Sequence, residues 1–477
     1  MQKSLGWFGI VRLGLVQMAL GGIIALATST LNRVMVVELA LPATLPGLLF
    51  GIHYAAEMLR PRWGHGSDKG GTRTPWIIGG MAVLAISGVC AAASVALMST
   101  KVLGSSHPDS LGSHYGIWWL IWWLYMTPGI AYAVLSYIGI GVGAGAAGTS
   151  LLVLIAKIVS PVRKPAAAAV VWTMMIAGTA LAAGLGGRML DPFSMTRLVT
   201  VSACISIICL TLSIIAIWGI ERRYIEEGEA GAEKPAHSFM EAIRDVWAEP
   251  EARRMTVFVF ISMLAFSAQE LLLEPFAGSV FALTPGETAQ LFGLHRGGIV
   301  LGMVLGAIVG SLSRRNQTAG RYWVAAGCFA SAIGLFSLAS VGIGGAQAFL
   351  KVVVFSLGAA NGVYAVAAIG TMISLASVGK GAREGVRMGL WGAAQAIAFG
   401  FGGVIGTAAV DVARYVLGSP SAAYSLLFAT QGVLFIFASG LAIRLTAAAA
   451  QAAQDQDSEL SLNESAQAVG EAGARMT

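Results

Sequence analysis

Charged and polar side chains interrupt several otherwise apolar stretches of this chain. They gather in four places: Asn32, Arg33 and Glu38; His53 and Glu57; Gln269, Glu270 and Glu274; and His295. Carboxylates in apolar surroundings are candidates for binding protons, and neutral imidazoles for hydrogen bonding between helices. The elements that carry these groups decide which chemistry they can perform.

The composition indicates which solvent surrounds those elements. Of the 477 residues, 56% are hydrophobic and 11% are charged, and the mean hydropathy is +0.75. Soluble globular chains carry about 25% charged residues. The chain is therefore predicted to lie in lipid, where roughly 20 apolar residues cross the bilayer and a central charge costs at least ~2.5 kcal/mol.

The apolar runs predict twelve membrane spans. Residues 115–156 form one long run that counts as a single span, because Pro128 and Gly129 divide it from a Trp-rich, interfacial segment at 118–123. The twelve predicted spans are Leu13–Asn32, Leu39–Leu59, Pro75–Met98, Tyr115–Ala156, Ala166–Gly187, Leu198–Ile220, Met255–Ala282, Ala289–Leu312, Tyr322–Leu350, Val352–Gly379, Met388–Val410 and Tyr415–Ile443.

The distribution of basic residues predicts the orientation. With a cytoplasmic N-terminus, nineteen basic residues fall in the five loops on the cytoplasmic side and five in the loops on the opposite side. Basic residues concentrate in cytoplasmic loops of membrane proteins, so both termini are predicted to be inside. The net charge of +6 mostly reflects these loops and does not indicate a nucleic-acid partner.

The spans divide into two halves of six. Residues 1–220 form the first half, 221–254 a charged cytoplasmic linker, 255–446 the second half, and 447–477 a polar tail predicted to be disordered. The pentapeptide LFGIH at 49–53 recurs as LFGLH at 291–295, an offset of 242 residues that also matches Ala40 and Leu41 to Ala282 and Leu283. This offset predicts a parallel internal repeat.

The loop after the second span carries a motif with a mechanical role. Its sequence GHGSDKGGTRTP, residues 64–75, resembles the G-x-x-x-D-R/K-x-G-R motif of the major facilitator superfamily. The motif predicts a charge-assisted latch between cytoplasmic helix ends, with Asp68 contacting a basic residue or a helix N-terminus. The latch residues are Gly64, Asp68, Lys69, Gly71 and Arg73.

Two further segments resemble one branch of that superfamily, the PucC and LhaA family of photosynthetic bacteria, and its LhaA members most. They are TLNRVMVVEL at 30–39 and LLEPF at 272–276, supported by GAAGTSLL at 145–152 and MGLWGAAQ at 388–395. The similarity extends over residues 10–445. In that family an Asp more often occupies the place of Glu270, so the negative charge is retained.

The resemblance implies an all-α bundle of twelve transmembrane helices and an assembly factor for light-harvesting antennae, chiefly the core complex. It would bind bacteriochlorophyll as cargo and deliver it to antenna polypeptides in the bacterial inner, photosynthetic membrane. Further partners would be pigment-synthesis enzymes and the insertion machinery. The magnesium of the pigment needs an axial ligand, for which His295 and His53 are candidates; Gln395 joins the polar residues as a candidate of the pigment cavity.

Two other functions remain open from the residues. A proton-coupled transporter of a small or tetrapyrrole-like substrate would use Glu38, Glu57, Glu270 and Glu274 to bind protons. A pigment-independent chaperone would hold antenna helices without touching pigment. The sequence contains no nucleotide-binding motif, metal-hydrolase spacing or nucleophile triad, so enzymatic activity and a nucleotide cofactor are not expected.

Two expectations concern contacts within the membrane. Arg33 is expected to pair with Glu270 or Glu274 across the halves, because charges buried in membranes are usually paired. His53 is expected to contact Glu57, four residues on, and to be structural. His295 lacks a carboxylate at that spacing and neighbours Arg296, so it is expected to stay neutral and face a pigment site or cavity.

Overall fold

The apolar runs of the sequence form long helices in the computed structural model of the chain. The structure describes residues 5–59, 72–104, 117–160, 163–221, 244, 247–312, 317–377 and 384–444. The helices are α1 (Trp7–Ala25), η1 (Leu26–Thr30), α2 (Leu31–Arg33), η2 (Val34–Glu38), α3 (Thr44–Glu57), α5 (Thr74–Gly104), α6 (Ile117–Ile158), α7 (Lys164–Leu190), α8 (Met195–Ile217), α11 (Pro250–Phe281), α12 (Pro285–Leu312), α13 (Gln317–Gly344), α14 (Gln347–Ser377), α15 (Glu384–Leu417) and a last helix, Pro420–Arg444.

Eleven helices of the described residues are long and apolar enough to cross a membrane. The predicted span that is not among these eleven is the second, Leu39–Leu59. It corresponds to α3, whose 14 residues extend over roughly 21 Å, less than the ~30 Å of a hydrocarbon core. Pro128 lies inside α6, and the spanning part of that helix begins there. The chain is a multi-pass membrane protein.

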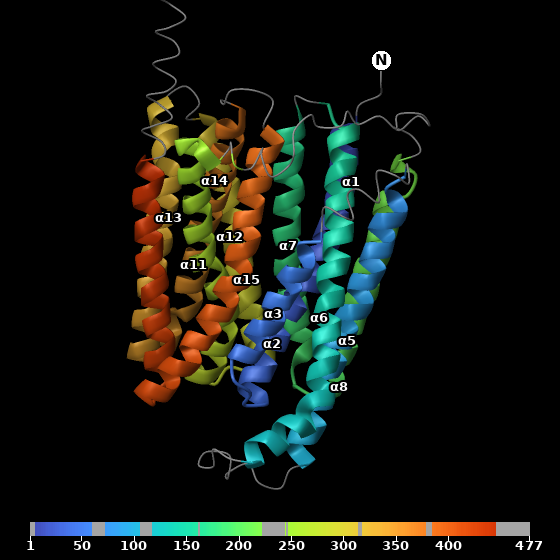
Figure 1. Ribbon diagram of the computed structural model, residues 1–477, viewed down its shortest axis with the longest axis vertical. Coiled ribbons are helices and arrows are strands. Elements are labelled where there is room, and N and C mark those ends of the chain that lie inside the picture. The colour runs from blue at the N-terminus through green and yellow to red at the C-terminus, as the bar shows by residue number, and fades with distance from the viewer. Residues whose placement is uncertain are drawn as a thin grey trace, which may run out of the picture.

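The helices form two groups that lie side by side (Figure 1). In the first half α1 packs on α7, α3 on α6, and α5 on α6; in the second half the equivalent pairs are α11 on α15, α12 on α14, and α13 on α14. The halves meet where α3 packs on α15 and where α12 packs on α7. These interfaces are equivalent under the repeat, so the pairing pattern agrees with the predicted internal duplication.

Individual backbone positions show the same repeat. Ala40 and Ala282, which the 242-residue offset matches, have φ angles of 50° and 54°, the non-glycine residues of the described chain with positive φ. Each lies just after the helical stretch of the first or seventh span. The two spans therefore terminate in the same backbone conformation.

The repeated pentapeptides lie where helices cross closely. A Cβ on Gly51 would lie 3.0 Å from Val404 of α15, and one on Gly293 would lie 2.8 Å from the backbone nitrogen of Gly184 on α7. Small residues allow helix backbones to approach in membranes, where little else drives association. The matched glycines thus serve the two equivalent contacts between the halves.

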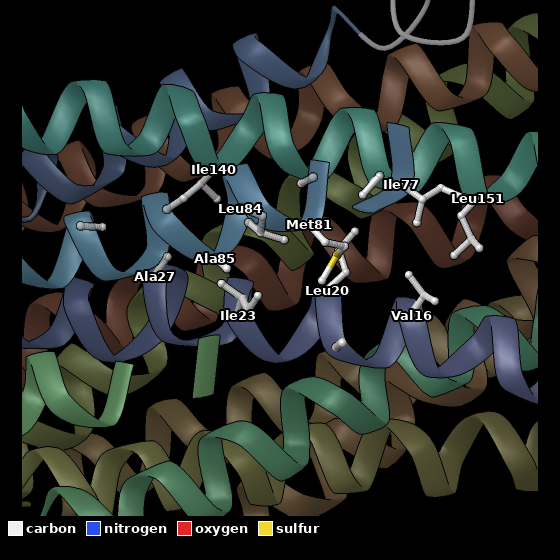
Figure 2. Packing of buried hydrophobic residues seen from close by; sticks show 14 of the residues in the cluster. Val16, Leu20, Ile23, Ala27, Ile77, Met81, Leu84, Ala85, Ile140 and Leu151 are labelled. Carbon is white, nitrogen blue, oxygen red and sulfur yellow. The ribbon is translucent and has the colours of Figure 1, made fainter. Parts of the chain in front are cut away.

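Apolar packing holds the first half together around the first span. Val16, Leu20, Ile23 and Ala27 of that span face α5 and α6, as the close view shows (Figure 2). All four are buried. This packing fixes the rotation of the first span, and therefore the direction in which its polar residues point.

The first span changes its winding where its polar residues begin. Residues 26–30 and 34–38 form π-helical turns, and the amide of Leu39 donates to the carbonyl of Val34 at 3.0 Å. The Ser29 hydroxyl donates to Ala25 O at 2.7 Å, a side-chain bond that competes with regular helix geometry. Single π turns of this kind are frequent at functional sites.

Candidate functional site

The polar residues of the first, seventh and eighth spans meet between the two halves. Asn32 is buried and donates through Nδ2 to the carbonyl of Leu271 on α11 at 2.7 Å. Because a buried amide needs partners, this bond fixes the depth of the first span against the seventh. The cluster around it consists of Asn32, Arg33, Glu38, Gln269, Glu270, Glu274, His295, Arg296 and Asn361.

Arg33 is bound at the end of its own span. It forms an ion pair with Glu38, five residues on, and Nη2 donates to the carbonyl of Leu283 at 2.6 Å. The π turn carries Glu38 to the side of Arg33, and Glu38 remains about one-third exposed. The predicted pairing of Arg33 with Glu270 or Glu274 is therefore wrong, although the bond to Leu283 does link the halves.

Glu270 forms an ion pair with a cation other than Arg33. Arg296 of α12 forms a buried ion pair with it, and the guanidinium carbon lies 4.7 Å from the ring centroid of Phe292. Such a position over an aromatic face stabilises a cation. From the sequence, Arg296 was predicted only as a neighbour of His295. Its pairing with Glu270 depends on the rotation of the helix, which no local spacing indicates.

Glu274 lies one turn beyond Glu270 and is fully buried. Within the described part of the chain, neither of its carboxyl oxygens forms a hydrogen bond. Ser29, Thr288 and Arg33 are the polar groups that act on it. It is thus a carboxyl group inside the bundle without an ion-pair partner among the described residues.

His295 belongs to a buried amide cluster. Its Nε2 lies 2.8 Å from Nε2 of Gln269 and 3.4 Å from Nδ2 of Asn361, whose amide also donates to Gln269 Oε1 at 3.3 Å. As an acceptor at Nε2, the ring carries its proton on Nδ1, and Nδ1 has no partner among the described residues. Asn361 on α14 was not predicted.

The expectation that His295 faces a pigment site or a cavity stays a prediction, because amide side chains surround the ring in this structure. The residue is 1% exposed, and amide groups cover its Nε2. Both amide donors must withdraw before that nitrogen could bind a metal. If Gln269 instead presented its oxygen, Nε2 would donate and the lone pair of Nδ1 would become available.

His53 differs from its counterpart. Its Nε2 lies 3.7 Å from Oε1 of Glu57 on the same helix, and the edge of its ring meets Tyr54 at 4.9 Å between centroids. The predicted neighbour within its own helix is confirmed. Gln395 is half-buried on α15 and takes no part in the hydrogen bonds of the cluster among the described residues.

The latch motif lies largely outside the described residues, which exclude Gly64, Asp68, Lys69 and Gly71. Its last member, Arg73, is buried and directly precedes α5. The amides of Arg73 and Thr74 donate to the carboxylate of Glu221 at 2.5 and 2.7 Å. Glu221 therefore caps this helix from the end of the sixth span, a contact that was not predicted from the sequence.

A second capping carboxylate, unlike Glu221, joins the two halves. Asp411 of α15 accepts bonds from the amides of Ala43 and Thr44 at 3.0 and 2.8 Å and from the Thr44 hydroxyl at 2.6 Å. It caps the N-terminus of α3, where an anion is favoured by the free amides and the helix dipole. This contact, too, was absent from the predictions.

An apolar cavity of about 380 Å³ lies away from the polar cluster, between α5 and α6. Trp76, Gly79, Gly80 and Gly143 are among its lining residues, which include no carboxylate, imidazole or amide side chain. It could receive an apolar group, but it offers magnesium no side-chain ligand.

The arrangement of the helices defines the class of protein. A bacterial homologue of the human lysosomal transporter Spinster, solved in an inward-facing and unoccupied conformation, superimposes with a TM-score of 0.64 over 92% of this chain and 96% of that one, at 14% identity. The fold is thus that of the major facilitator transporters.

Sequence comparison narrows the class to a family. The PUCC protein family matches residues 30–450, and the chain belongs to it. The protein called bacteriochlorophyll synthase 44.5 kDa chain, from Rhodobacter capsulatus, is 44% identical over 93% of this chain and 97% of its own length. Protein PucC of Cereibacter sphaeroides is 28% identical over 90% of each chain.

Proposed function

We propose that this chain is an assembly factor for light-harvesting antennae that binds bacteriochlorophyll and delivers it to antenna polypeptides in the bacterial photosynthetic membrane. The observation that carries the proposal is the near full-length 44% identity to a relative named for bacteriochlorophyll, within a family of transporter-like fold. The core antenna is the complex we assign to it. No catalytic step is assigned to the chain.

The polar cluster supports a cargo site between the halves. His295 is the candidate imidazole, and Nε2 is its candidate ligand atom, because Nδ1 carries the ring proton when Nε2 accepts from the amides. A neutral imidazole is a suitable axial ligand for the magnesium of a chlorin. Since the amides of Gln269 and Asn361 cover Nε2, pigment binding would require these two side chains to turn, as the halves separate around the cluster.

The test is the absorption spectrum of the protein purified gently from a photosynthetic host. Bacteriochlorophyll bands that copurify in a fixed ratio, and that transfer to added antenna polypeptides, support the proposal. Normal protein with bound antenna polypeptides and no pigment would favour a pigment-independent chaperone. Proton-dependent uptake of a solute into proteoliposomes, again without pigment, would favour a transporter.

A further inference from the structure

Glu274 differs from the other carboxyl groups of the polar cluster. Glu270 is neutralised by Arg296 and Glu38 by Arg33, whereas Glu274 forms no ion pair or hydrogen bond among the described residues. It is also the most deeply buried of the three. A carboxylate buried without a partner is so costly that the group takes up a proton instead.

The hydroxyl groups beside Glu274 suit a protonated carboxyl. Ser29 donates its proton to Ala25 O at 2.7 Å, and Thr288 donates its proton to Pro285 O at 3.1 Å. While these two bonds are formed, both oxygens present lone pairs to Glu274; if they turned away from the backbone, the same hydroxyls would donate to a carboxylate. An acid can donate to such oxygens, but a carboxylate, which only accepts, cannot.

Other charged and titratable groups on the elements around α11 are already engaged or distant. They are Arg33 and Glu38 of the first span, His295, Arg296 and Glu287 of α12, Lys351 and Tyr364 of α14, Arg387, Asp411 and Arg414 of α15, and Tyr424 of the last helix. Of these, Arg33 is the one that acts on Glu274. Glu270, one turn earlier on α11, is held by Arg296.

Arg33 lies within one helical turn of that carboxyl. A Cβ built on Gly278 would lie 3.0 and 3.1 Å from Nε and Nη2 of Arg33, so the guanidinium covers Gly278. Gly278 follows Glu274 by four residues and shares its face, about 5–6 Å along the helix. A negative charge on Glu274 would therefore attract this guanidinium, which now binds Glu38 and the Leu283 carbonyl.

We propose that Glu274 is a proton-binding site, and that loss of its proton draws Arg33 away from Glu38 and the Leu283 carbonyl. The bond to Leu283 joins the end of the first span to the end of the seventh, at the face opposite the start of α1 (Figure 1). Deprotonation thereby releases one link between the halves at that face, while protonation restores it. This switch goes beyond pigment delivery and does not depend on it.

Infrared spectroscopy tests the proton site directly. The purified wild-type protein at neutral pH should show the carbonyl stretch of a protonated carboxylic acid in a site shielded from water. Glu274→Gln should remove this band, and Glu287→Gln, which changes an exposed carboxylate of α12, should retain it. Absence of the band from the wild-type protein, which needs no variant to fold, would overturn the proposal.

Spin labels test the switch. Cysteines in place of Ala40 and Ala282, two exposed and equivalent positions at that face, report the separation of the first and seventh spans once the native cysteines are replaced. The distance should lengthen as the pH rises and the infrared band is lost, and Glu274→Gln should hold it short at every pH. A distance that changes with pH equally in Glu274→Gln, or not at all in the wild type, refutes the switch.

Discussion

The buried ion pair between Glu270 and Arg296 allows a prediction about stability. Loss of the arginine should destabilise the protein in a pH-dependent way, and loss of the glutamate in a pH-independent way. Both side chains are buried, and neither has another ion-pair partner among the described residues. Removing one member of such a pair costs about 3–5 kcal/mol, whereas replacing both by neutral groups is nearly free. The decrease in the free energy of unfolding should therefore depend on pH in one single variant and not in the other.

Arg296→Met leaves a buried carboxyl that can escape ionisation by taking up a proton. Protonating a glutamate carboxylate that ionises freely in the unfolded chain costs roughly 3–4 kcal/mol at pH 7 and about 1 kcal/mol at pH 5, since each pH unit is worth 1.36 kcal/mol. The variant should therefore lose about 3–4 kcal/mol at pH 7 and regain most of it at pH 5. The folded form binds the extra proton, so stability falls as the pH rises.

Glu270→Gln leaves a guanidinium, which keeps its charge in this pH range. The free energy of unfolding of this variant should fall by about 3–5 kcal/mol at both pH 5 and pH 7. The double variant should lie within about 1 kcal/mol of the wild type and show no such pH dependence. Unfolding in mixed micelles, with labelling of the fully buried Cys328 as the signal, measures all four proteins. Additive single losses, or an Arg296→Met loss equal at pH 5 and 7, would refute the reasoning.

Three further changes have defined outcomes. His295→Gln should lower bound pigment and assembled core antenna at normal protein level, whereas His53→Gln should lower the protein level itself; full pigment and antenna in both would exclude either imidazole as a needed ligand. Asp411→Ala removes three hydrogen bonds to the start of α3 and should cost about 2 kcal/mol or more in the same unfolding assay. Asp68→Asn should reduce accumulation in the host more than Asp109→Asn, and equal tolerance would leave the latch motif without a role.

The sequence alone determined the class and the repeat. Length of apolar runs decides which segments enter lipid, because an unpaired charge or backbone group there is costly, and this is a local property. The 242-residue offset located equivalent helix crossings at Gly51 and Gly293, since a close crossing requires a small residue. The contact of His53 with Glu57 followed from spacing within one helix.

Tertiary structure decided which partner each remaining polar residue takes. Arg296 reaches Glu270 from the next helix, His295 reaches Asn361 from 66 residues away, and Asp411 reaches Thr44 from 367 residues away. Such pairings depend on the depth and rotation of helices, which packing sets and which no spacing within one helix encodes. Arg33 illustrates the difference most clearly: a π turn places Glu38 beside it, so the nearest carboxylate lies on its own span and Glu274 remains unpaired.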